Sequence, residues 1–111
     1  KPRIDSIKVR LSNIDRTLVV DVEVYDSESA IHRVLLVYSI NSTKWVYRDM
    51  EVLKRYTVEP VGGYGYRKEV YTMQVEVSAG TMIEFYIVAI DNAGNHVKSS
   101  IHAYKVIEGQ S

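Results

Sequence analysis

"YTMQVEVSAGTMIEFYIVAIDNAGN", residues 71–95, contains two strand-like runs separated by a turn, and it decides the fold class. Apolar residues occupy every second position of the later run, where the inward set is Ile83, Phe85, Ile87 and Ala89. A period of two is typical of a β-strand with one face in a core. The small and polar residues 78–81 and 91–95 have turn chemistry. We therefore expect strands over 69–77 and 82–90.

The same alternation extends over most of the chain. Residues 17–26 place Leu18, Val20, Val22 and Val24 on one face, while residues 32–40 are apolar on both faces, as in a central strand. Further strands are expected over 3–11, 44–52 and 96–106, whereas 53–61 is ambiguous because Pro60 limits any strand there to a sheet edge. About seven strands without a helical pattern predict an all-β fold, a sandwich or a barrel. The core expected for a sandwich is Val20, Val22, Leu36, Trp45, Val75, Phe85 and Ile87.

Composition limits the function classes. The 111 residues contain 14 Lys+Arg and 14 Asp+Glu, so the net charge is zero and the basic excess of nucleic-acid binders is missing. The absence of cysteine excludes disulfides, thiol catalysis and Cys-based zinc sites. No apolar run approaches the ~20 residues of a membrane helix, so no membrane insertion by this segment is expected. We expect one domain over 1–111, excised from a larger chain.

Two stretches resemble a known family. Residues 34–50, "VLLVYSINSTKWVYRDM", contain an apolar strand, Tyr-Ser, a polar turn, Trp and then Met; residues 71–95 contain an aromatic-x-Ile/Val-x-Ala strand that ends in Asp-Asn-x-Gly-Asn. Together they resemble the Ig-like or fibronectin-type-III-like modules of prokaryotic surface and secreted proteins. The resemblance spans about two thirds of the chain and is specific for fold, because these modules share a scaffold and not a chemistry.

The resemblance implies an antiparallel Greek-key β-sandwich of about seven strands, extracellular or on the cell surface. The implied function is a non-catalytic spacer or docking module, whose partners are neighbouring domains of the same polypeptide. The alternative is a carbohydrate-binding accessory module of a secreted hydrolase, with a protein or polysaccharide as ligand. A third class is a module that accepts a partner strand, which requires an unprotected sheet edge.

The turn at residues 91–95 has two interpretations. Asp91 and Asn92 can bond their own backbone and Gly94 can adopt a positive φ, which makes the cluster a simple turn. In a sandwich, however, this turn shares one end of the molecule with residues 26–30. A calcium site is the alternative, because calcium prefers oxygen ligands; its candidate ligands are Asp26, Glu28, Asp91 and Asn95.

Aromatic residues supply the candidate ligand-binding positions. Tyr64 and Tyr66 lie in a glycine-rich loop, where exposed rings suit a sugar or a protein. Trp45 and Tyr47 share one strand face and form either core packing or a platform for carbohydrate. Asn41 begins an Asn-Ser-Thr motif in a loop and is a candidate N-glycosylation site.

We expect no enzymatic activity. Ser99, Ser100 and His102 lie within four residues, but nothing around them resembles a nucleophile elbow. The glycine-rich loop precedes a strand, whereas a phosphate-binding loop needs a helix behind it.

Overall fold

The computed structural model describes residues 1–12, 16–26, 29–58 and 66–106, with Tyr66 described by its backbone alone. The described residues form nine strands and no helix. The strands are β1 (Pro2–Ser12), β2 (Thr17–Asp26), β3 (Ile31–Ile40), β4 (Val46–Asp49), β5 (Glu51–Val58), β6 (Tyr66–Glu76), β7 (Met82–Asp91), β8 (His96–Lys98) and β9 (His102–Lys105). A helix able to cross a membrane is not found in this part of the chain.

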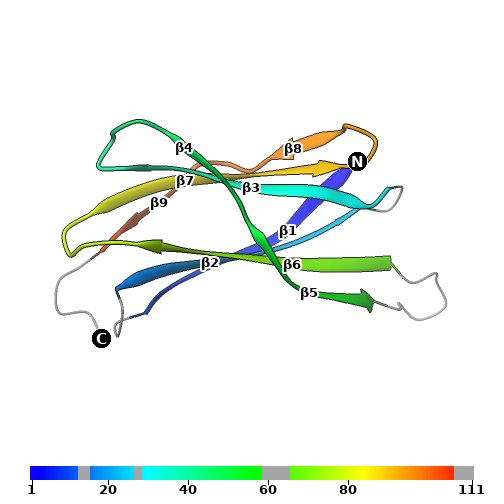
Figure 1. The fold of residues 1–111 in the computed structure, drawn as a ribbon, viewed down its shortest axis with the longest axis horizontal. Coiled ribbons are helices and arrows are strands. Elements are labelled where there is room, and N and C mark those ends of the chain that lie inside the picture. Colours follow the sequence, from blue (N-terminus) through cyan, green and yellow to red (C-terminus); the bar gives the residue numbers. More distant parts are fainter. Residues whose placement is uncertain (13–15, 27–28, 59–65, 107–111) are drawn as a thin grey trace.

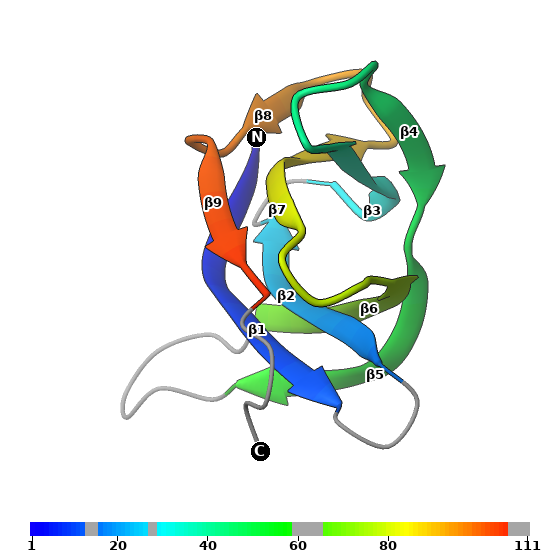
Figure 2. The same cartoon turned by 90° about the vertical axis from the view of Figure 1, so that its left-hand side faces the viewer.

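Two antiparallel sheets face each other, which confirms the predicted all-β sandwich (Figures 1 and 2). The first sheet has the strand order β1-β2-β6-β5. The second has the order β4-β3-β7-β8, and β9 also pairs with β7. The turn at residues 78–81 therefore joins two strands of different sheets, whereas the turn at 91–95 closes the β7–β8 hairpin.

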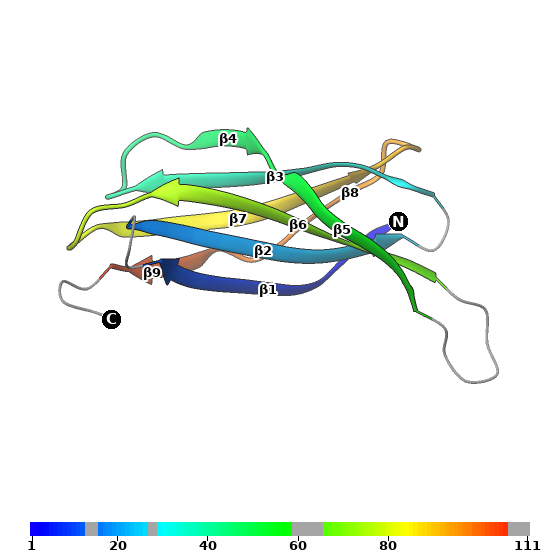
Figure 3. The ribbon, with the colours of Figure 1, turned by 60° about the horizontal axis from the view of Figure 1, so that its bottom comes forward.

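The strand expected over 44–52 is in fact two strands, because the chain changes sheets at Met50. β4 ends at Asp49 on the edge of the second sheet, and β5 begins at Glu51 on the edge of the first (Figure 3). The Met50 amide donates a hydrogen bond to the Val34 carbonyl at 2.8 Å, and its side chain is buried. The ambiguous segment after residue 52 thus continues as an edge strand, while Pro60 lies outside the described residues.

The strand expected over 96–106 is also divided in two. Between β8 and β9, the Ser99 hydroxyl accepts a hydrogen bond from the Ile87 amide at 2.9 Å, and the Ser99 amide donates one to the Ile87 carbonyl at 2.9 Å. The Ser99 side chain thus replaces a main-chain partner at this interruption, and β8 and β9 remain attached to the same strand, β7.

The edges of the first sheet are protected against strand addition. Register shifts mark a bulge at Asp5 in β1 and another at Leu53 in β5. Charged side chains are exposed on both strands; they include Arg3, Lys8 and Arg10 in β1 and Lys54 and Arg55 in β5. Bulges and charges are the usual devices that prevent edge-to-edge pairing. These features disfavour the addition of a partner strand to the first sheet.

The core fills the space between the sheets. Six of the seven residues predicted for it are buried: Val20, Val22, Leu36, Val75, Phe85 and Ile87. The prediction for Trp45 is wrong, because 40% of this residue is exposed. Val46 packs against the core, and its neighbours Trp45 and Tyr47 therefore lie on the opposite, outward side of the edge strand.

A buried tyrosine of the first sheet, Tyr71, connects the core to Glu69, the one buried glutamate among the described residues. The Tyr71 hydroxyl donates to Glu69 Oε1 at 3.1 Å, and Arg55 Nε donates to the same oxygen at 2.8 Å. Burial, and then the negative charge of Glu69, raises the pKa of Tyr71 to about 12. The neutral hydroxyl is therefore the form that the fold stabilises.

This raised pKa predicts alkaline destabilisation. Unfolded tyrosine ionises near pH 10, so the contribution of Tyr71 is complete below that pH and is lost as pH rises to about 12. We expect the free energy of unfolding to fall by about 2 to 3 kcal/mol more in the wild type than in Tyr71→Phe across this window. The midpoints of urea unfolding at the lower and upper ends of this pH window measure the difference, and Tyr104→Phe serves as the control. An equal fall in wild type and Tyr71→Phe would refute the assignment.

Candidate functional site

The outer face of the second sheet has an apolar centre in β3, in contrast to that of the first. On the first sheet, Lys68 forms outward ion pairs with Asp5 at 2.6 Å and Glu23 at 3.0 Å. On the second, Leu35 and Val37 point away from the core, because their neighbours in β3 belong to it. Val37 nevertheless has 0% exposure. The described structure has no third layer over this face. The side chains of the adjacent strands must therefore cover Val37.

An aromatic strip, defined as Trp45, Tyr47 and Tyr86, lies over this face. Val37 of β3 pairs with Tyr47 of β4 on one side and with Tyr86 of β7 on the other. The Trp45 and Tyr86 ring centroids are 5.5 Å apart, with an interplanar angle of 51°. Tyr47 is 64% exposed, while Tyr86 is half-buried. Trp45, just before β4, and Tyr47, within it, thus carry the two rings that face solvent.

Tyr86 holds the strip together. Its hydroxyl interacts with the Tyr47 side chain, and this interaction, followed by burial, raises the pKa of Tyr86. The Lys98 ammonium lies 4.3 Å from the Tyr86 ring centroid, within cation–π range. Tyr86 therefore contacts Trp45, Tyr47 and Lys98 at once, which restricts the orientations of the exposed rings.

The structure brings together two of the four predicted ligand-binding residues and adds one. Trp45 and Tyr47 share the strip, as their alternation in the sequence predicted. Tyr66 begins β6 in the other sheet, and Tyr64 lies outside the described residues. Tyr86 was missed because its contact with Tyr47 depends on the register of three strands. One indication of its position was present in the sequence: Phe85 was predicted to face the core, so the next residue, Tyr86, must face outward.

The turn interpretation of residues 91–95 is confirmed. Asp91 Oδ1 accepts a hydrogen bond from the Asn95 amide at 2.8 Å, and Asp91 Oδ2 accepts one from Asn95 Nδ2 at 3.2 Å. Gly94 has a φ of 89°, in the left-handed region that glycine adopts readily. Asp91 itself is buried. Its carboxylate therefore closes the turn.

Three of the four calcium candidates meet at this end of the sandwich. The Asn92 amide donates to the Ala30 carbonyl at 2.9 Å, which joins the two turns. The main-chain nitrogen of Lys1 lies 3.4 Å from Asp26 Oδ1 and 4.0 Å from Asp91 Oδ2, so the two carboxylates approach the same point. Glu28 lies outside the described residues. Among the residues that are described, no group of three or more acidic, His or Cys side chains could hold a metal ion.

We expect calcium to leave the stability of the protein unchanged. Both Asp91 oxygens already accept hydrogen bonds from Asn95 within the turn. A ligand that binds the folded state raises the melting temperature. Thermal unfolding in millimolar calcium and in EDTA should therefore give the same midpoint. A higher midpoint in calcium, lost in Asp26→Asn, would establish the calcium site instead.

Asn41 occupies a tight turn after β3 at the end of the sandwich opposite to Asp91. Its φ is 52°, its amide donates to the Met82 carbonyl at 2.7 Å, and its Oδ1 accepts from the Met82 amide at 2.9 Å. The residue is exposed, while its side-chain oxygen has a structural role. N-glycosylation here stays a prediction.

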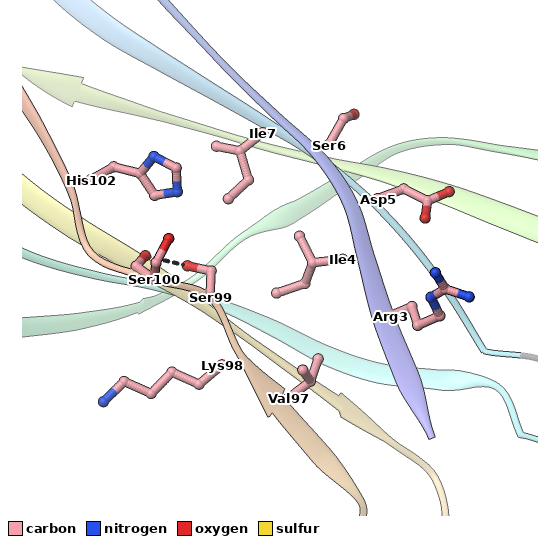
Figure 4. Close-up of a pocket in the computed structure, with 10 residues that line it drawn as sticks. All are labelled: Arg3, Ile4, Asp5, Ser6, Ile7, Val97, Lys98, Ser99, Ser100 and His102. Carbon is pink, nitrogen blue, oxygen red and sulfur yellow. Dashed lines mark hydrogen bonds between the residues drawn. The ribbon is translucent and has the colours of Figure 1, made fainter.

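A cavity of about 420 Å³ lies between β1 and the β8–β9 segment. Ile4 and Ile7 extend into it from β1, and Ser99 and His102 approach from the other side (Figure 4). The Ser99 hydroxyl donates its proton to the Ser100 carbonyl at 2.8 Å, and the His102 ring stacks on Phe85 at 5.3 Å. The hydroxyl is thus oriented toward a carbonyl oxygen rather than toward an imidazole base.

No protein-family model matches the sequence, and no curated protein matches it. Among solved structures, the chain is similar to the "Br derivative BhCBM56", a carbohydrate-binding module. The sequence identity is 11%, the TM-score is 0.49, and the alignment covers 92% of this chain and 97% of that one. At so low an identity and TM-score, nothing about the ligand or the site of this chain follows from the similarity.

Proposed function

We propose that the protein is a non-catalytic binding module that binds a polysaccharide on the aromatic strip. The observation that carries the proposal is the pair of exposed rings, Trp45 and Tyr47, held by Tyr86 on the outer face of the second sheet. Sugar rings present apolar C–H faces that pack well on aromatic rings, while their hydroxyls stay hydrated at the rim. Large rigid rings also provide contact area at low cost in side-chain entropy.

The restricted orientation of the rings supports this proposal. Binding costs free energy whenever it has to immobilise a flexible side chain. The contacts of Tyr86 already restrict the side chains of Trp45 and Tyr47 in the folded protein, so ligand binding has less side-chain motion to immobilise. Tyr86→Phe, which keeps the ring and removes the hydroxyl, separates the effect of the hydroxyl from that of ring packing.

Retention on insoluble polysaccharides tests the function. We expect the wild type to bind at least one of cellulose, chitin, xylan and starch, and Trp45→Ala to weaken that binding about 10- to 30-fold, as for an aromatic hot spot. Tyr25→Ala is the matched control, because Tyr25 lies on the outer face of the first sheet, with the Arg3 guanidinium 5.5 Å from its ring centroid. Equal affinities of the two variants, or no retention of the wild type, would contradict the proposal.

A spacer or docking role between neighbouring domains is the second candidate function. The observation that favours it is the shape of the molecule, 48 × 28 × 19 Å, with the start of β1 and the end of β9 at opposite ends of the long axis (Figure 1). This arrangement suits a module placed in line between domains. A wild type that binds none of the polysaccharides would favour this role.

The type of β-sandwich and the location of the protein are also proposals. We propose an Ig-like or fibronectin-III-like type, and an extracellular or cell-surface location. The order β1-β2-β6-β5 opposite β3-β7-β8 supports the type, since immunoglobulin domains pair their first, second, fifth and fourth strands in one sheet. In this comparison β4 is an additional edge strand of the second sheet and is left out of the count. β5 is then the fourth strand and β6 the fifth.

A further inference from the structure

A polar cavity of about 380 Å³ lies at the corner where the chain crosses from one sheet to the other. Arg48, Asp49 and Glu51 line it from the β4–β5 segment, and Thr72, Met73 and Gln74 line it from β6. Its volume is within the range of about 300 to 1,000 Å³ that is typical of small-molecule sites. The partly buried Met73 is the one apolar side chain in this lining.

Asp49 connects this cavity with the aromatic strip. Tyr47 and Asp49 pair with Val37 and Leu35, so both point outward from β4. Alternate residues of a strand are about 7 Å apart. A ligand that extends along β4 therefore meets Trp45, then Tyr47, and then the rim of the cavity at Asp49.

The Asp49 carboxylate is held in one orientation. Arg33 Nε donates to Oδ1 at 2.8 Å, and Arg33 Nη2 donates to Oδ2 at 3.0 Å. These hydrogen bonds lower the pKa of Asp49, so the group is ionised at neutral pH. Each carboxylate oxygen can accept more than one hydrogen bond. Asp49 is thus an oriented acceptor between the strip and the cavity.

The lining matches the chemistry of a neutral sugar. Arg48 supplies donors, Glu51 supplies acceptors, and Thr72 and Gln74 supply both. Sugar hydroxyls donate and accept in the same way. The carboxylates of Asp49 and Glu51 are balanced by Arg48 and by the Arg33 guanidinium bound to Asp49, so the local charge does not favour an ionised sugar over a neutral one.

We propose that this cavity is a second subsite, which binds the hydroxyls of a neutral sugar unit of the polysaccharide that stacks on Trp45 and Tyr47. The proposal rests on the proposed function. The ligand runs along β4, its ring faces pack on the strip, and the next unit hydrogen-bonds Asp49 and Gln74. The strip provides contact area, and the cavity provides discrimination between sugars.

Affinity electrophoresis with soluble xylan, glucuronoxylan, hydroxyethylcellulose and starch tests this subsite. For the neutral polysaccharide that retards the wild type, we expect Asp49→Asn and Gln74→Ala each to weaken binding about tenfold, because each removes hydrogen bonds to the ligand. Glu76→Ala is the matched control, since Glu76 is an exposed residue of β6 outside the cavity lining. Melting temperatures of the variants verify that they fold.

The outcomes separate this subsite from the proposed function. Wild-type affinity in both cavity variants, together with a loss in Trp45→Ala, would overturn the subsite and leave the strip intact. Preference for glucuronoxylan over neutral polysaccharides would also overturn it. A wild type that no polysaccharide retards would instead contradict the proposed function itself. Tenfold losses in the cavity variants, with Glu76→Ala unchanged, would establish the subsite.

Discussion

Replacing Phe85 by alanine is expected to lower the free energy of unfolding by about 3 to 5 kcal/mol. Phe85 is 1% exposed, lies between the two sheets and stacks its ring on His102. Truncation removes the apolar area that the ring buries and leaves a cavity that rigid strands can fill only in part. Urea unfolding followed by Trp45 fluorescence measures the change.

Val88→Ala is the control for Phe85→Ala. Val88 lies on the same strand but faces outward and is half-buried, so its truncation should cost about 1 kcal/mol or less. Similar losses in the two variants would mean that the two faces of β7 do not differ in burial as described.

Asp91→Ala is expected to cost about 2 to 4 kcal/mol. The carboxylate is buried and accepts two hydrogen bonds from Asn95, so its removal leaves the Asn95 amide without this partner. Hydrogen bonds to a charged, buried group contribute more than neutral ones. Chemical denaturation at neutral pH measures the loss.

Asn92→Ala tests whether the Asp91 effect is specific. Asn92 is an exposed neighbour in the same turn, and its hydrogen bond to Ala30 uses the main chain, which the substitution retains. We expect a change within about 0.5 kcal/mol. If both variants lost the same amount, the stability of the turn would not depend on the Asp91 carboxylate.

The local features of the fold could be predicted from the sequence. Alternation identified the inward faces of β2 and β7, because burial on one side of a strand selects apolar residues at every second position. The Asp91–Asn95 turn was likewise readable, since its hydrogen bonds and the positive φ of Gly94 lie within five residues. Each of these features depends on neighbours in the chain.

The features that were missed depend on residues far apart in the chain. Trp45 was assigned to the core because tryptophan is usually a core residue in a sandwich, although it shares the outward parity of Tyr47 and is exposed. The change of sheets at Met50 leaves no break in the alternation, so residues 44–52 read as one strand. The strip needs β3 to lie between β4 and β7, and the polar cavity needs β6 to lie beside the crossing. Neither arrangement of strands can be predicted from residues that are close together in the sequence.

An NMR titration of the ¹⁵N-labelled protein shows directly whether the outer face of the second sheet binds polysaccharide. The probe is a soluble oligosaccharide of the polysaccharide that retains the wild type. We predict shift changes concentrated in the amides of residues 45–49 and around Tyr86, and in the Trp45 indole N–H. Changes confined to the outer face of the first sheet, or to the cavity between β1 and β8, would contradict the account.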